Sequence, residues 1–149
     1  MTELTYDNLV EQLIATVPEI LPAYREDKEW MGDDSLPHIV FSFDLNPYIR
    51  ALLESHDAGA SLRRIFRFLE EMAVSQDEHV QEVLAQSVLE HFSGNVPDLL
   101  PKARVYMGDA TRHLSHVVAV AWGHELPYDD DPPEIKAMAP GPRPLNGGL

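Results

Sequence analysis

Hydrophobic positions repeat at helical spacing along most of this 149-residue chain, and the strongest repeat lies between Ser61 and Phe92. Its members recur at intervals of three and four, which places them on one stripe of each of two helices. The stripe residues are Leu62, Ile65, Phe66, Leu69, Met72 and Ala73, then Val80, Val83, Leu84, Ser87, Val88 and Phe92. A capping box of Ser75 and Glu78 is expected between the two helices. This stretch predicts a helical hairpin around which the rest of the chain packs.

Weaker repeats predict further helices on both sides of the hairpin. A first helix is expected from Thr5 and a second from Pro18, because threonine caps a helix and proline fits its first turn. The other start signals are Asn46 as a cap before Pro47, Pro97, and Asp109 as a cap ahead of the last apolar stripe. Residues 36–43 are rich in β-branched and aromatic residues, but no second strand accompanies them. For that segment a helix start and an extended packed segment both stay open.

These segments predict an all-α domain of antiparallel helical hairpins, packed as a short HEAT-like or α-solenoid-like bundle. The helical domain is expected to cover residues 1–126 as a single unit. Residues 127–149 contain six prolines and three glycines. That composition predicts a Pro/Gly-rich tail that is extended or flexible.

The composition excludes several classes of protein. There is no cysteine, which excludes a disulfide framework and any thiolate metal site. The first residues lack the basic and apolar regions of a secretion signal, and the longest apolar run, from Val117 to Trp122, is far short of the roughly 20 residues of a membrane span. We therefore expect a cytoplasmic protein without membrane contact.

The negative charge is concentrated near the N-terminus. The net charge is −14, and residues 1–34 contain nine acids and two bases. Such a field repels nucleic acid and attracts a basic protein partner. The partner-binding residues that we predict are Glu26, Asp27, Glu29, Trp30, Asp33 and Asp34. An exposed tryptophan among carboxylates would anchor that partner. Two alternatives stay open: the acidity serves only solubility, and Trp30 packs against the first helix.

One group of residues has the spacing of a metal site. Asp109, His113 and His116 lie at i, i+4 and i+7, on one face of the last predicted helix. Three such ligands could hold a divalent ion, but Asp109 is already expected as a cap and no second ligand motif accompanies the group. We therefore predict no bound metal. A small metal-dependent enzyme that uses the histidines of the last helix is the alternative function.

Other catalytic patterns do not occur in the sequence. It has neither a Gly-x-Ser-x-Gly motif nor a glycine-rich phosphate loop. The neighbouring carboxylates Glu70 and Glu71 splay apart on a helix and are expected to face solvent. The one basic cluster, Arg63, Arg64 and Arg67, is expected to pair internally with acids of the first helix. The sequence predicts a non-catalytic protein with no catalytic residues and no cofactor.

Six short signatures follow one another along the chain. They are Asn8-Leu9-Val10, Val17-Pro18-Glu19-Ile20, Leu36-Pro37-His38, Ile65-Phe66-Arg67-Phe68-Leu69-Glu70, Val80 through Glu90, and Met107-Gly108. As an ordered set across about residues 6 to 120, they resemble a bacterial family of small all-helical domains of unknown function. Members of that family are similar to immunity proteins of toxin systems. The resemblance implies an all-helical fold, and it implies that the basic partner is a cognate toxin.

Overall fold

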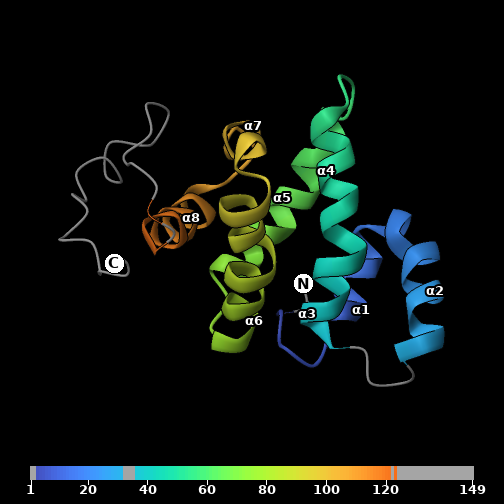
Figure 1. Cartoon of the computed structure of the whole chain (residues 1–149). Coiled ribbons are helices and arrows are strands. Elements are labelled where there is room, and N and C mark those ends of the chain that lie inside the picture. The colour runs from blue at the N-terminus through green and yellow to red at the C-terminus, as the bar shows by residue number, and fades with distance from the viewer. Residues whose placement is uncertain (1–2, 32–35, 122, 124–149) are drawn as a thin grey trace.

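The structure, a computed structural model, describes residues 3–31, 36–121 and 123 of the chain. Every regular element among these residues is a helix, which confirms the predicted all-α fold class (Figure 1). The expected domain end near residue 126 and the expected tail at residues 127–149 lie outside the described residues.

The described elements are α helices, 3₁₀ turns and π-helical segments. In chain order they are α1 (Leu9–Thr16), the 3₁₀ turn η1 (Pro18–Ile20), α2 (Leu21–Met31), α3 (Pro37–Val40), the π segment η2 (Phe41–Leu45), α4 (Asn46–Glu54), α5 (Gly59–Ala73), α6 (Glu78–Val83), the π segments η3 (Leu84–Leu89) and η4 (His91–Asn95), the 3₁₀ turn η5 (Pro97–Leu99), α7 (Leu100–Arg104) and α8 (Asp109–Ala121).

Two long helices each contain π-helical turns. One runs without a break from Pro37 to Glu54, and the other runs from Glu78 to Asn95. The segment at residues 36–43 is therefore helical from Pro37, not extended. Asn46 lies inside the first long helix and makes no cap hydrogen bond, so its predicted role as an N-cap is wrong. Proline fits after Asn46 because the π segment has already changed the hydrogen-bond register before it.

Helix α5 is the centre of the packing. It contacts α1, α4, α6 and α8, so it joins elements from both ends of the chain. Leu69 of α5 and Leu84 of η3 are both fully buried, and the predicted hairpin around them is confirmed. The HEAT-like arrangement is not confirmed, because a solenoid repeat contacts only its neighbours.

The turn between α5 and α6 also holds the N-terminal residues. Asp77 caps α6 by accepting from the N–H of His79 at 3.0 Å, and it also accepts from the N–H of Tyr6 at 2.8 Å. The Ser75 hydroxyl donates to the carbonyl of Leu4 at 3.1 Å. The predicted capping box of Ser75 and Glu78 is therefore wrong, because the serine has a distant partner and Asp77 takes the cap position.

Helix α8 is capped by a residue of another helix. Glu70 of α5 accepts from the backbone N–H groups of Ala110 and Thr111 at 3.0 and 2.9 Å and from the Thr111 hydroxyl at 2.7 Å. A Cβ at Gly108 would lie 2.5 Å from the carboxyl carbon of Glu70, so only glycine leaves room for this contact. Asp109 is exposed in the first turn and is not the cap that the sequence predicted. Glu70 is likewise not the solvent-facing carboxylate that we expected.

Candidate functional site

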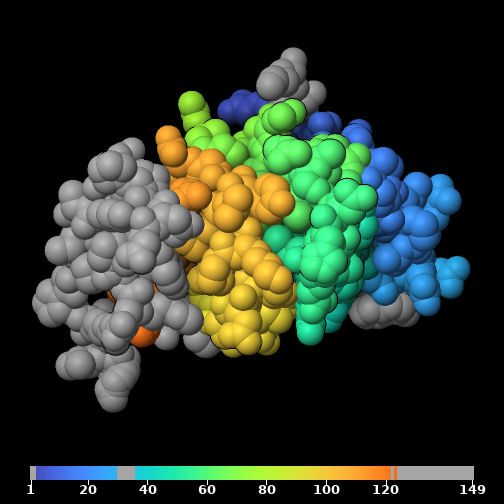
Figure 2. All heavy atoms as spheres, turned by 90° about the horizontal axis from the view of Figure 1, so that it is seen from above, coloured from blue at the N-terminus to red at the C-terminus, as the bar shows by residue number. Residues whose placement is uncertain are grey.

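The acidic residues of the N-terminal helices lie at one end of the molecule. The blue atoms of α1 and α2 gather there in the space-filling view (Figure 2). Residues 3–31 contain seven acids and two bases. Of the predicted partner-binding residues, Glu26 and Glu29 of α2 are exposed and Asp27 is half-buried. The Trp30 side chain, Asp33 and Asp34 lie outside the part that the structure describes.

A buried carboxyl lies beneath α2. Asp44 of η2 is only 3% exposed, and no N–H or hydroxyl group of the described residues donates to either of its oxygens. Burial first, then hydrogen bonding to Asp27 and the charge of Asp27, raise the pKa of Asp44 to about 7. Two carboxyls hydrogen-bond only when one of them carries a proton. Asp27 therefore contributes to the attachment of α2 as well as to the acidic end.

A polar groove lies between the two long helices, which run side by side (Figure 1). It has a volume of about 410 Å³, within the range of ligand sites. A smaller hollow of about 200 Å³ shares Ser42, Asn46 and His91 with it. The groove is lined by Ser42, Phe43, Asn46, Gln86, Ser87, Glu90, His91 and Asn95. Phe43 is 59% exposed, an unusual position for a phenylalanine. Both walls contain π-helical turns, which occur frequently at functional sites.

Ser87 connects the walls at the floor of the groove. The Asn46 side-chain N–H donates to the Ser87 carbonyl at 2.6 Å, and Nδ1 of His38 lies 2.9 Å from the Ser87 hydroxyl. Asn46 is only 4% exposed, and its Oδ1 has no hydrogen-bond donor among the described residues. The floor of the groove therefore contains an amide oxygen, Oδ1 of Asn46, that accepts no hydrogen bond from the described residues.

The charge along the groove is slightly negative. Arg50 lies 3.7 Å from Glu54 in an exposed ion pair at the hollow. Burial lowers the pKa of His91, and the charge of Arg50 lowers it further, so this imidazole is neutral at pH 7. Glu90 is the remaining charged residue in the lining of the groove.

The histidines of the last helix do not converge. Asp109 and His113 are exposed, whereas His116 is buried. Burial first, then the charges of His113 and Arg104, lower the pKa of His116. Within the described residues, no three histidine, aspartate or glutamate side chains are placed to hold one metal ion.

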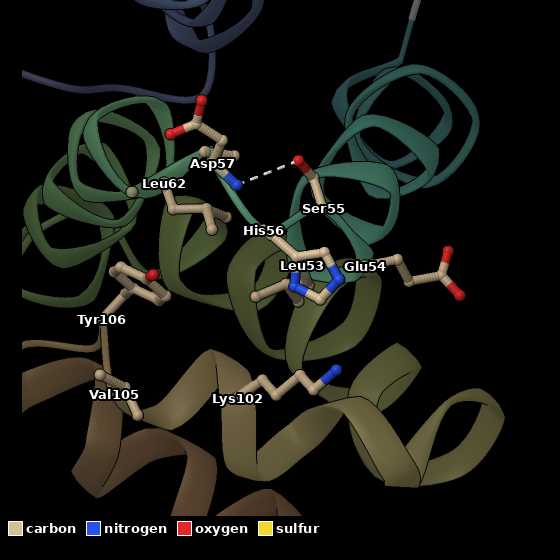
Figure 3. Close-up of a pocket in the computed structure, with 11 residues that line it drawn as sticks. Leu53, Glu54, Ser55, His56, Asp57, Leu62, Lys102, Val105 and Tyr106 are labelled. Atoms are coloured by element: carbon tan, nitrogen blue, oxygen red, sulfur yellow. Dashed lines mark hydrogen bonds between the residues drawn. The ribbon is translucent and has the colours of Figure 1, made fainter.

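A second hollow of about 460 Å³ lies between the α4–α5 loop and α7 (Figure 3). The His56 ring and the Lys102 side chain lie on facing sides of it, while the Glu54 and Asp57 carboxylates point away. The His56 and Lys102 side chains are both exposed, and no buried polar residue belongs to the described lining. This hollow therefore lacks the fixed polar groups that orient a ligand.

One arginine of the basic cluster on α5 forms an ion pair within the molecule. Arg64 forms an ion pair with Glu19 of η1, so it pairs internally as expected, but its partner lies after the first helix and not in it. Arg63 and Arg67 are exposed on the same helix.

In a comparison with protein families, the model described as Domain of unknown function (DUF7674) matches residues 10–122. Comparison with curated proteins and with solved structures finds no match. Among the described residues, no helix has both the length and the apolar character that crossing a membrane requires.

Proposed function

We propose a function for this chain, which belongs to the family of Domain of unknown function (DUF7674): it is a non-catalytic module that binds a basic protein at its acidic end. The observation that carries the proposal is the charge of residues 3–31, which contain seven acids and two bases. Four of these acids and both bases lie in α1 and α2 themselves. A surface of this kind steers a basic partner toward itself and raises the rate of association.

The exposed residues of α2 are the proposed contacts. Glu26 and Glu29 are both exposed, and the chain direction of α2 continues to Trp30, the predicted anchor. Tryptophan is enriched among the residues that contribute most to binding at protein interfaces. Neutralisation of a cognate toxin is the specific form of this function that the resemblance to immunity proteins implies.

An affinity experiment with matched charge reversals tests the proposal. The wild-type protein, Glu26→Lys/Glu29→Lys and the control Glu82→Lys/Asp98→Lys are immobilised in parallel and exposed to an extract of the source cells. All four positions are exposed, so the two variants have the same change in charge at different faces. We expect a basic protein that binds the wild type and the control but not the α2 variant. A partner that binds all three equally would refute the acidic end as the binding site.

A further inference from the structure

The side chains of the groove between the long helices match the chemistry of a peptide backbone. Asn46, Gln86 and Asn95 each carry a primary amide, which offers the same donor and acceptor as a peptide group. Asn46 is buried and donates to the Ser87 carbonyl, so it shapes the floor of the groove, whereas Gln86 and Asn95 are exposed and within reach of a ligand. A groove of about 410 Å³ with two exposed amides can hydrogen-bond backbone groups of a bound chain.

The rim of the groove adds an apolar anchor and a negative charge. Phe43 is 59% exposed and belongs to the lining, so a side chain of the bound peptide can pack on its ring. His91 does not offset the negative charge of Glu90, because the imidazole is neutral at pH 7. Arg50, at the neighbouring hollow, already pairs with Glu54. A lysine or arginine of the ligand is therefore favoured beside Glu90, and its aliphatic stem can cover Phe43.

We propose that this groove binds an extended peptide segment containing a lysine or arginine. An extended segment fits because its backbone N–H and C=O groups are available to the amides, whereas a helix uses most of these groups internally. The proposal rests on the proposed function in one respect, since the segment belongs to the same kind of basic protein partner. It adds a second surface, separate from Glu26 and Glu29 of α2.

Titration of the full chain with a synthetic peptide tests the groove directly. The probe is acetyl-Ala-Leu-Lys-Leu-Ala-amide, added to ¹⁵N-labelled protein and followed by heteronuclear NMR. We expect the side-chain amide signals of Gln86 and Asn95, and the backbone signals of residues 42–46 and 86–95, to shift with one common Kd. A peptide with glutamate in place of lysine should bind at least about fivefold more weakly, because it meets Glu90. A peptide with N-methylated backbone nitrogens should lose binding, because it lacks the donors.

Variants at exposed positions keep the test independent of folding. Phe43→Ala should weaken the lysine peptide about tenfold, whereas Val74→Ala, which removes an exposed apolar side chain elsewhere, should leave Kd unchanged. Gln86→Leu should also weaken binding, because it removes one amide at an exposed site. Absence of shifts at millimolar peptide, or equal binding of the lysine, glutamate and N-methylated peptides, overturns the proposal.

The outcomes separate this inference from the proposed function. If Glu26→Lys/Glu29→Lys abolishes capture of a basic protein and the peptide does not bind, the acidic end is supported as a binding site and the peptide groove is refuted. If the peptide binds the groove and the double variant captures the partner normally, the peptide groove is supported and the acidic end is refuted as the binding site.

Discussion

Replacing Asp44 by asparagine should make the stability of the protein less dependent on pH. The carboxyl of Asp44 is buried, and its pKa is raised from an ordinary 3.8 to about 7 by burial first and by Asp27 second. Between these two pH values the folded chain holds a proton that the unfolded chain has released. The free energy of unfolding must therefore fall as pH rises from about 4 to about 7, and below pH 4 this contribution is fully retained.

The magnitude follows from the size of the shift. A change from 3.8 to about 7 corresponds to an upper bound of about 4 kcal/mol of stability lost above pH 7, at about 1.4 kcal/mol per pH unit. Asparagine has nearly the shape of the protonated carboxyl, and its N–H group can donate to Asp27. We therefore expect Asp44→Asn to match the wild type near pH 4 and to exceed it at pH 8 by roughly 2–4 kcal/mol.

Urea denaturation followed by far-UV circular dichroism at pH 4, 5, 6, 7 and 8 measures this difference. Asp98→Asn, at an exposed position, serves as the control and should follow the wild-type curve. The reasoning is refuted if the difference between Asp44→Asn and wild type is the same at pH 4 and pH 8, because then the buried carboxyl does not titrate in that range.

Three further predictions concern the core, the cap of α8 and the last helix. Leu69→Ala and Leu84→Ala should each cost about 2–5 kcal/mol in chemical denaturation, because both side chains are fully buried; less than about 1 kcal/mol for both would show that the hairpin is not the core. Gly108→Ala should cost about 1–3 kcal/mol through its clash with Glu70, and a double-mutant cycle should find a smaller cost in the Glu70→Ala background; strict additivity would contradict the contact. Elemental analysis of protein purified without a histidine tag should find well below one zinc or iron per chain, since Asp109 and His113 are exposed while His116 is buried; a value near one would favour the metal-dependent enzyme.

The helices could be predicted from sequence because burial imposes a local period. The stripe from Leu62 to Phe92 is apolar at every third or fourth position, and these residues form the centre of the core. Pro18 likewise marked the boundary after α1, since proline fits a first turn.

The helix ends could not be predicted, because their partners are distant in sequence. Glu70 caps a helix that begins 39 residues later, at Asp109, and Asp77 binds the N–H of Tyr6, 71 residues earlier. Local capping rules assign such a role to the nearest suitable side chain, which led to Asp109 and to Ser75 with Glu78.

The groove was also missed, and its signals are weak in the sequence. Phe43 fits the apolar pattern of residues 36–45, and only the fold shows that its ring is exposed. Asp44 did carry a signal, because a carboxylate inside an apolar run requires a partner when it is buried. The π-helical turns change which residues share a face, so a 3.6-residue period misplaces the side chains around them.

Association kinetics at two salt concentrations test the central claim most directly. The basic partner captured by the wild-type protein is mixed with wild type, Glu26→Gln/Glu29→Gln and Trp30→Ala at low and at physiological salt. We predict a wild-type association rate that falls steeply as salt rises, a slower and less salt-dependent rate for the double variant, and faster dissociation for Trp30→Ala. An association rate that ignores both salt and the two glutamate substitutions would contradict the proposal that the acidic end of the molecule binds this partner.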